Sequence, residues 1–317
     1  MVWGSNDRSV LVLVGPTASG KTAVGIALAQ RLGGEIISAD ARQVYRFMDI
    51  GTAKPTPEER ESVPHHCIDA LTPDQVFNAA EFGAAGRTII DEIFARLRLP
   101  IVVGGSGLYI RSLIDGLFEG PGADPEFRDA TESRLRLGGT EALLEELRRV
   151  DPVSAERIDH TKPRRLIRAL EVFHATGTPL SALHRTPRPP LSFVPCIFGL
   201  LRDRKELYTR INERCRRIVE DGLLTEVADL QRRGYSSSLN ALNTVGYREA
   251  YACLRGEIDV AEMLRLFQQN SRRYAKRQLT WFRADPRVQW VHVAAADTPD
   301  RLAAEIERRF LEAHGSR

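Results

Sequence analysis

The sequence predicts an α/β protein in which a parallel β-sheet core, covered by helices, is interrupted by an all-helical domain. Short apolar runs rich in β-branched residues, such as VLVLV at 10–14, alternate with helical segments. A stretch crowded with glycine and proline then opens a long region without a strand pattern, and a buried strand pattern returns at 193–201. We therefore expect a discontinuous core of residues 1–117 and 191–317 and an inserted domain at 118–190.

Composition sets broad limits on the protein. With 317 residues, of which 43% are apolar, the chain can build a large core, and a net charge of +3 favours no particular partner. The four cysteines lie far apart, without a C-x-x-C pair, and no secretory leader is recognisable. We expect a cytoplasmic protein with reduced thiols, no membrane span, and a monomeric state.

The first strand pattern leads into GPTASGKT, which matches the phosphate-binding pattern G-x-x-x-x-G-K-[ST]. An amphipathic segment follows and ends at Gly33, so the motif has the expected strand, loop and helix context. Lys21 can place its charge on terminal phosphates, and Thr22 can ligate Mg²⁺. The core is thus expected to resemble the P-loop NTPases, and its phosphate-binding residues are Gly15, Pro16, Thr17, Ala18, Ser19, Gly20, Lys21 and Thr22.

Two further strand patterns end in polar residues. EIIS leads to Asp40, and LPIVV at 99–103 leads to a glycine turn that holds Ser106. Because ligands bind beyond the carboxyl ends of parallel strands, these residues should share one crevice with the phosphate loop. Asp40 alone could equally cap a helix or form an Asx-turn, and Ser106 could belong to an ordinary turn.

Within the insert, a helix is expected at 163–173. Its apolar face consists of Leu166, Ala169, Leu170 and Phe173. Its opposite face carries Arg164, Arg165 and Arg168. TPRPPLS at 186–192 is expected to be a linker back to the sheet.

After the returning strand, the pattern predicts further helices, an edge strand at 288–293, and a last helix with Thr298 as N-cap and Pro299 in its first turn. The segment 202–217 holds seven basic residues against three acidic, and 262–283 holds six against one. Each cluster alone could be a solvated helix face. Together with the insert arginines they favour a polyanionic partner such as nucleic acid.

A phosphate loop facing a carboxylate suits two chemistries. In a kinase it would hold ATP while a base meets the acceptor hydroxyl. In an alkyl transfer it would stabilise departing diphosphate while the carboxylate takes a proton from the nucleophile. A nucleic-acid-binding module that senses nucleotide is a third interpretation, whereas the lack of an N-K-x-D motif argues against a GTPase.

Longer motifs distinguish these alternatives. The chain resembles the tRNA dimethylallyltransferases, also called tRNA isopentenyl transferases, over about residues 10 to 290. The motifs that carry the resemblance are GPTASGKT, MDIGTAKP, PHHCID, VVGGSGLYIRSLIDGL, RRLIRALEVF, VGYREA and AKRQLTWFR. The resemblance implies transfer of the dimethylallyl group of dimethylallyl diphosphate to the N6 amine of the adenosine 3′ of the anticodon in tRNA. It also implies Mg²⁺ as cofactor, and tRNA as partner.

The resemblance also assigns roles to residues. Asp40 would be the general base, while Thr17, Lys21 and Arg214 would hold the diphosphate whose oxygens, with Thr22, bind Mg²⁺. The residues that would contact tRNA are Asp40, Ala41, Arg42, Gln43, Ser106, Arg128, Arg164, Arg165, Leu166, Ile167, Arg168, Arg248, Lys276, Arg277 and Gln278.

The chain departs from the family pattern at a few positions. Ala41 stands where serine is usual, Ser106 where threonine is commoner, and Arg164 where glutamine is frequent. The zinc finger of eukaryotic relatives is not found, as expected for a bacterial type. His65, His66 and Cys67 are adjacent and cannot all face one metal ion on regular backbone, and the Gly-Tyr pair at 246–247 could be a simple turn.

Overall fold

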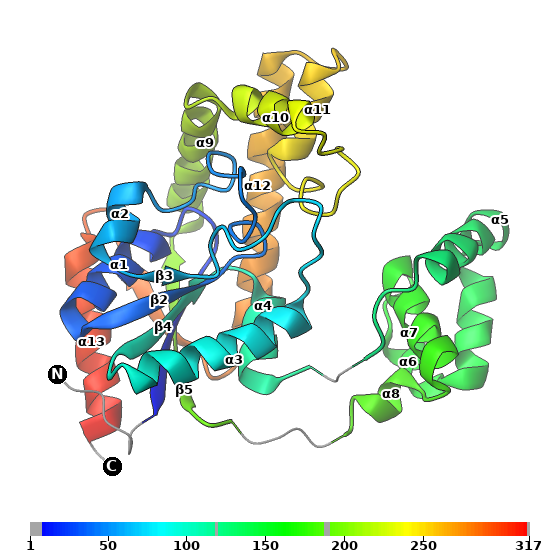
Figure 1. Ribbon diagram of the computed structural model, residues 1–317, viewed down its shortest axis with the longest axis horizontal. Helices are drawn as coiled ribbons and strands as arrows, with labels where there is room; N and C mark the ends of the chain where they lie inside the picture. Colours follow the sequence, from blue (N-terminus) through cyan, green and yellow to red (C-terminus); the bar gives the residue numbers. More distant parts are fainter. Residues whose placement is uncertain (1–7, 118–119, 187–190, 316–317) are drawn as a thin grey trace. The chain divides into compact units, whose positions relative to one another are not determined.

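A six-stranded sheet forms the core of the unit that contains residues 1–115 and 191–317, in the order β3-β2-β4-β1-β5-β6. The structure is a computed structural model that describes residues 8–117, 120–186 and 191–315. All neighbouring strands are parallel, as Figure 1 shows. The strands are β1 Ser9–Val14, β2 Gly34–Ala39, β3 His65–His66, β4 Leu99–Gly104, β5 Val194–Arg202 and β6 Gln289–Val293.

Helices connect and cover these strands. The helices of the core are α1 Lys21–Leu32, α2 Pro57–Ser62, α3 Ala79–Ala95, α4 Gly107–Asp115, α9 Arg204–Glu220, α10 Leu223–Arg232, α11 Tyr247–Leu254, α12 Val260–Arg283 and α13 Pro299–Gly315. The helices of the insert are α5 Pro125–Val150, α6 Pro152–Arg157, α7 Pro163–Thr176 and α8 Leu180–Leu183.

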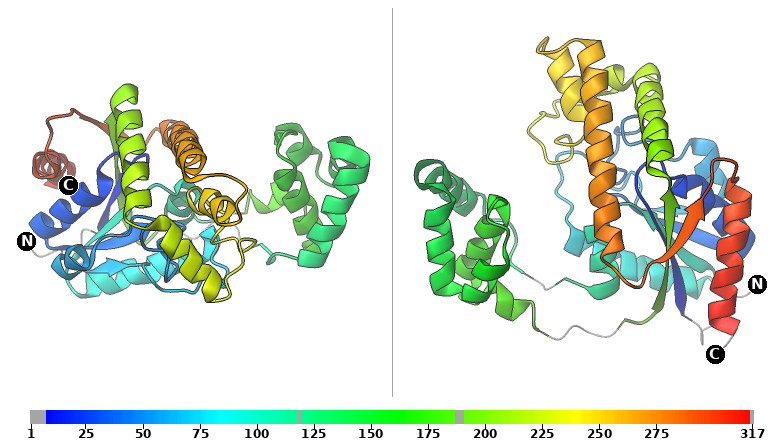
Figure 2. Two further views of the ribbon diagram at one scale, coloured as in Figure 1. Left: turned by 90° about the horizontal axis from the view of Figure 1, so that it is seen from above. Right: turned by 180° about the vertical axis from the view of Figure 1, so that it is seen from behind.

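Both faces of the sheet are buried. Leu11 and Leu13 of β1 pack in one cluster with residues of α1 and α13, while the intervening Val12 is equally buried on the opposite face. α3 and α4 cover that second face (Figure 2). A strand covered on both sides gains from apolar residues at every position, which explains why VLVLV shows no alternation.

A group of four helices, α9, α10, α11 and α12, lies next to the sheet (Figure 1). α9 follows β5 directly, so it starts at the carboxyl end of that strand. The four helices share a second apolar cluster with the segment that follows β2, including Tyr45 and Met48. This arrangement places α9 and α12 close to the residues that end the central strands.

The chain divides into two compact units. One contains residues 1–115 and 191–317 and holds the sheet, and the other contains residues 116–190. The second unit is helical in its described residues, with a core drawn from α5, α6 and α7. Gly139 interrupts α5 with non-helical backbone angles. Phe173, expected on the buried face of α7, is only half-buried, and Ile167 takes a core position instead.

The α/β fold with a parallel P-loop-like sheet is confirmed. β6 lies at the sheet edge as expected, and the hydroxyl of Thr298 accepts a hydrogen bond from Arg301 N at the start of α13. Residues 187–190 of the expected linker lie outside the described residues. Among the described helices, none has the length and apolar character needed to cross a bilayer.

Candidate active site at the carboxyl ends of the central strands

The phosphate loop connects β1 to α1 and is held by side chains from distant segments. Arg202, at the end of β5, donates a hydrogen bond to Ser19 O at 3.0 Å, and Arg210 of α9 donates one to Ala18 O at 3.1 Å. Ala18 adopts a left-handed backbone conformation with φ of 62°. Because such a conformation is costly for a residue with a side chain, these bonds help to keep the loop in shape.

Gln278 of α12 also binds the loop. Its Oε1 accepts a hydrogen bond from Thr17 N at 2.8 Å, and its Nε2 donates one to Gly105 O at 3.0 Å. Its side chain is therefore a bridge between the phosphate loop and the turn after β4, and the residue is only 6% exposed. Both ends of its amide have partners inside the protein, although Gln278 also lines the cavity, and its expected contact with tRNA stays a prediction.

The ends of β2 and β4 approach each other closely. A Cβ added at Gly104 would lie 2.2 Å from Ala39 O, so only glycine allows this approach. Beyond it, Ser106 Oγ accepts a hydrogen bond from Ala41 N at 3.1 Å. Asp40 Oδ1 accepts one from Arg42 N at 2.9 Å, which is an Asx-turn. Asp40 therefore forms the Asx-turn that the sequence allowed, and it also lines the cavity described next.

A cavity of about 250 Å³ lies where these segments meet. Its polar wall includes Thr17, Lys21, Thr22, Asp40 and Arg214. The sequence separates these residues by almost two hundred positions, and the fold brings them to one place as expected from the strand ends. Such a concave site with converging charged groups is typical of a binding or catalytic site.

The electrostatics of the cavity favour an anion beside the lysine. Burial, reinforced by the positive charge of Arg214, lowers the pKa of Lys21 to about 8, although the negative charge of Asp40 opposes this shift. Burial also lowers the pKa of Arg214, again against the effect of Asp40. Lys21 Nζ donates one hydrogen bond to Pro16 O at 3.1 Å. Two desolvated cations near one carboxylate leave an excess of positive charge that a phosphate group would neutralise.

Tyr274 of α12, which lies in the basic segment 262–283, also lines the cavity. Burial, joined by the charge of Asp40, raises the pKa of Tyr274 to about 12, while a hydrogen bond with Ser106 works against this. Its hydroxyl therefore remains protonated beside Asp40. The spacing between Tyr274 and Gln278, one helical turn, is the signal that would have placed both on one face.

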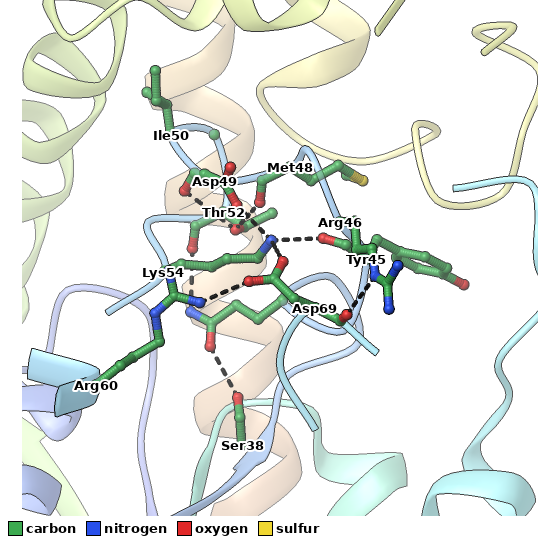
Figure 3. A network of polar contacts seen from close by, with 12 residues as sticks. Ser38, Tyr45, Arg46, Met48, Asp49, Ile50, Thr52, Lys54, Arg60 and Asp69 are labelled. Atoms are coloured by element: carbon green, nitrogen blue, oxygen red, sulfur yellow. Dashed lines mark hydrogen bonds and ion pairs between the residues drawn. The ribbon is translucent and has the colours of Figure 1, made fainter. Parts of the chain in front are cut away.

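Gln43 is buried in the opposite part of the same wall. Its Oε1 accepts from Ser38 Oγ at 2.9 Å, and its Nε2 lies 3.4 Å from Thr52 O and 3.3 Å from Ala53 O. Figure 3 shows Ser38 and Thr52 within the larger polar network of this region. The side-chain amide of Gln43 therefore has partners within the protein, and both Arg42 and Gln43 line the cavity.

His65 and His66 serve different purposes. His66 Nε2 lies 2.8 Å from Glu35 Oε2, and Arg96 binds the same carboxylate through two nitrogens. His65 pairs with Val63 O through Nδ1 at 2.7 Å and lines the cavity. Burial is the main cause of its lowered pKa, which favours the neutral ring. The two imidazoles point to different partners, and neither arrangement resembles a shared metal site.

In the helical unit, the insert arginines divide into two sets. Arg128 and Arg168 both bind Glu171, which is 1% exposed, with distances of 2.7 and 2.6 Å. Burial alone would raise the pKa of Glu171, but the hydrogen bonds from these arginines lower it. Arg164 and Arg165 are exposed on the surface of α7.

Two residues expected to contact tRNA lie in the core of this unit. Leu166 is 0% exposed and Ile167 is 5% exposed, and both pack against α5 residues such as Leu143. Their side chains are therefore unavailable to an RNA, which corrects the expectation for them. Helical spacing explains why these two side chains are buried, because only one face of α7 can be exposed.

The remaining basic residues expected at an RNA surface are accessible. Arg248 of α11 is about half-exposed at its side chain, and Lys276 and Arg277 of α12 are exposed. The guanidinium of Arg277 lies 5.6 Å from the centroid of the Tyr274 ring. This basic surface on α12 is therefore adjacent to a residue of the cavity.

The fold and the cavity together define an α/β protein with a P-loop-like phosphate site that faces a carboxylate. A family model described as IPP transferase matches residues 43–285. The chain belongs to this family, the tRNA dimethylallyltransferases, and is a transferase of the prenyl-transferring type.

Similar proteins support this placement over nearly the whole chain. A tRNA dimethylallyltransferase of Geobacillus thermodenitrificans is 45% identical over 304 residues, covering 96% of this chain and 95% of that protein. One from Carboxydothermus hydrogenoformans is 46% identical over 286 residues, covering 90% and 92%. The crystal structure of the tRNA isopentenylpyrophosphate transferase of Bacillus halodurans has a TM-score of 0.72 at 40% identity, covering 96% of each chain. A eukaryotic dimethylallyltransferase acting on tRNA, 24% identical with a TM-score of 0.82 over 97% of this chain and 80% of that one, shares the fold.

Proposed function

We propose that the cavity transfers the dimethylallyl group of dimethylallyl diphosphate to the N6 amine of the adenosine immediately 3′ of the anticodon in tRNA. One observation carries this proposal: Asp40 faces Lys21 and Arg214 in a single cavity bordered by a phosphate-binding loop. The family supplies the type of reaction. The names of the similar proteins supply the allyl donor and the RNA acceptor.

The chemistry requires a base on the acceptor side. The bond between the allylic carbon and the diphosphate oxygen breaks, the N6–carbon bond forms, the N6 proton passes to Asp40, and diphosphate leaves. An exocyclic adenine amine is a weak nucleophile because its lone pair is delocalised into the ring, so removal of the proton assists attack. Since Asp40 Oδ1 accepts from Arg42 N, Oδ2 is the oxygen assigned to proton acceptance.

The leaving group requires positive charge at the opposite side of the reacting carbon. Lys21 and Arg214 are desolvated, so their interaction with a diphosphate is stronger than it would be in water. Amides in the first turn of α1 lack intrahelical acceptors and can bind phosphate oxygens. The amide of Thr17 is taken by Gln278, so its hydroxyl is assigned to the ligand instead.

The cavity offers Mg²⁺ few protein ligands. Among the described residues, no cluster of three or more His, Cys, Asp or Glu side chains could hold a metal ion. Thr22 lines the cavity, so its hydroxyl together with diphosphate oxygens would form the site. When bound, the ion would supply further neutralisation of the diphosphate charge.

The acceptor adenine has to leave the stacked anticodon loop to enter a cavity of this kind, which costs a few kcal/mol. Ser106 and Tyr274, which lie by Asp40, are proposed to border the extruded base. Contacts to RNA phosphates are assigned to Arg248, Lys276 and Arg277. We assign residues 118–190 as a tRNA-binding domain, with the exposed Arg164 and Arg165 in that role.

Incubation with an unmodified anticodon stem-loop and labelled dimethylallyl diphosphate tests the proposal directly. We expect label to enter the RNA, and to be absent from a matched stem-loop carrying guanosine at the acceptor position, which lacks the N6 amine. A parallel reaction with γ-labelled ATP should transfer no phosphate. Equal labelling of the guanosine RNA, or phosphate transfer from ATP to a small acceptor, would contradict the proposed function.

A further inference from the structure

Glu226, on α10, holds a turn of the cavity wall from outside the cavity. Its Oε2 accepts hydrogen bonds from Asp49 N at 2.7 Å and Ile50 N at 2.6 Å. Its Oε1 accepts one from Gly51 N at 3.0 Å and one from the hydroxyl of Tyr247 at 2.6 Å. A carboxylate offers about four lone-pair sites, so these three amides and one hydroxyl use them all.

The turn is packed directly on Tyr247. A Cβ added at Gly51 would lie 2.5 Å from the Tyr247 ring, so the two surfaces are in close contact. Tyr247 is 0% exposed, and its hydroxyl stays a donor because burial and the charge of Glu226 raise its pKa. Gly51 and Tyr247 both line the cavity. Glu226 therefore fixes two neighbouring parts of the wall at once.

The other side of the turn is also tied down, as Figure 3 shows around Lys54. The side chain of Lys54 is 2% exposed, and its Nζ donates to Tyr45 O at 2.6 Å. The same nitrogen pairs with Asp49 at 2.6 Å and with Asp69 at 2.5 Å. Contacts from several segments thus hold the turn in place, with α10 supplying the one carboxylate that spans its three amides.

Backbone conformation supports this view of the turn. The non-glycine residues with a left-handed conformation include Phe47 and Ala53 on either side of the turn, with φ of 68° and 46°. Cys67 and Asp69, in the adjoining loop, share this conformation. A strained conformation of this kind persists only where surrounding contacts hold the backbone in place. If those contacts are removed, the turn is expected to relax.

Much of the wall that the turn completes is apolar, although Thr52 and Thr244 also line it. Its apolar residues include Ile211, Cys215, Ile218, Val245, Tyr247 and Phe267. Ile50 belongs to the same hydrophobic cluster. Pockets for drug-sized ligands usually measure about 300–1000 Å³, whereas this cavity measures about 250 Å³. With a diphosphate at the phosphate loop and the acceptor base beside Asp40, the remaining space suits a short alkyl chain.

We propose that Glu226 is a positioning residue that sets the length of the allylic chain the enzyme accepts, by holding the 49–51 turn against Tyr247. The inference rests on the proposed function, because the chain in question is that of the allylic diphosphate. Glutamine at this position has one acceptor oxygen and a donating amide. At least one of the four donors would then face the amide of the glutamine instead of an acceptor. Because that hydrogen bond would be lost, the turn would move outward.

Kinetics with two allylic diphosphates test the inference. E226Q and wild type are compared using dimethylallyl diphosphate, with five carbons, and geranyl diphosphate, with ten, on the same stem-loop RNA. For E226Q we expect the preference for the shorter chain, measured as the ratio of kcat/KM values, to fall about 10-fold or more. KM for the five-carbon substrate should rise, with kcat changed less, because the wall contributes binding rather than charge stabilisation.

The matched control is D229N, which neutralises an exposed carboxylate on the same helix that pairs with Arg232. It should keep both the ratio and KM of wild type. Y247F removes one of the four hydrogen bonds and keeps the ring, so it should shift the ratio in the same direction but to a smaller extent. If E226Q does not fold, Y247F is used in its place.

An unchanged ratio in E226Q, or in Y247F where E226Q does not fold, would overturn the inference. A general loss of stability would lower activity on both substrates equally, so the ratio separates positioning from folding. Failure of wild type to label RNA would instead contradict the proposed function. Transfer by wild type with an unaltered ratio in the variants would contradict only the role of Glu226.

Discussion

The sheet unit keeps its key cations inside a cavity, whereas the helical unit divides its arginines between a buried carboxylate and the solvent. Lys21 and Arg214 are desolvated next to Asp40. Arg128 and Arg168 share the single buried carboxylate of Glu171, while Arg165 is exposed. Charges of the same type are thus placed for three different purposes.

This difference shows that a basic residue cannot be assigned a role from its charge alone. A desolvated cation interacts strongly with one small anion and responds little to salt. An exposed arginine contributes to a diffuse, salt-dependent attraction for polyanions. An arginine paired with a buried carboxylate is needed by the fold, because its removal leaves that carboxylate with fewer partners in the protein interior. Substitutions in the two units should therefore have separable effects.

The largest effect is expected for Asp40→Asn. Loss of the proton acceptor should lower kcat by about 10²–10⁴-fold, and tRNA affinity should remain close to that of wild type. Asparagine can still accept the hydrogen bond from Arg42 N, so the turn is retained. Single-turnover labelling of a stem-loop RNA measures the effect, with the exposed Asp74→Asn as control. Wild-type turnover by Asp40→Asn would remove Asp40 from the base role.

The next effect concerns the cavity cations. Lys21→Ala should lower kcat by about 10²–10³-fold, since each preorganised charge at the leaving group contributes to transition-state stabilisation. Its affinity for inorganic diphosphate should fall as well, and both can be followed by kinetics and calorimetry. Arg308→Ala, which removes an exposed arginine of α13 paired with Glu312, is the control. Full activity in Lys21→Ala would mean that the loop does not hold the leaving group.

The helical unit is tested by two arginines three residues apart. Arg165→Ala should weaken RNA binding and reduce the slope of log affinity against log salt by about 1. Arg168→Ala should leave that slope unchanged and instead destabilise the unit by about 1–3 kcal/mol, because Glu171 loses one of its partners. Filter binding from about 50 to 200 mM salt and thermal unfolding measure the two quantities. Identical behaviour of the two variants would contradict the division proposed for α7.

The smallest effect is a dependence on pH. The pKa of Lys21 is lowered to about 8 by burial and Arg214, so near pH 8 a part of the molecules carries a neutral lysine. A bound diphosphate favours the charged form and raises this pKa, so binding takes up protons and weakens as pH rises above 8. Calorimetry in two buffers of different ionisation enthalpy would detect the uptake, and Lys21→Ala corrects for the titration of diphosphate itself. Equal proton uptake by both proteins would count against the shifted lysine.

Much of the fold could be predicted because its signals are local. The run VLVLV at 10–14 is apolar at every position, and a strand buried on both faces is the structure that requires this. Thr298 and Pro299 marked the start of α13 through the chemistry of helix capping. The convergence of Asp40 and Ser106 on the phosphate loop followed from the rule for carboxyl ends of parallel strands.

Other features could not be predicted because they depend on pairs distant in sequence. Gln278 bridges Thr17 and Gly105 across more than one hundred and seventy positions, and no local pattern marks such a bond. Glu226 binds a turn 175 or more residues away and carries no motif of its own. For α7 the error arose differently: the resemblance named a continuous run of residues, although helical geometry exposes only part of it.

By itself the sequence determined five of the six strands, the phosphate loop, the catalytic carboxylate candidate and the family, because each depends on residue type and short spacing; β3 at His65–His66 was not expected. The tertiary structure alone decided which polar groups are already engaged. It placed Lys21, Asp40 and Arg214 in one cavity, where burial lowers the pKa of Lys21 and of Arg214. It also bound Glu226 to the turn that completes the wall, because the carboxylate and its donors lie on segments that are distant in sequence and that only the fold brings together.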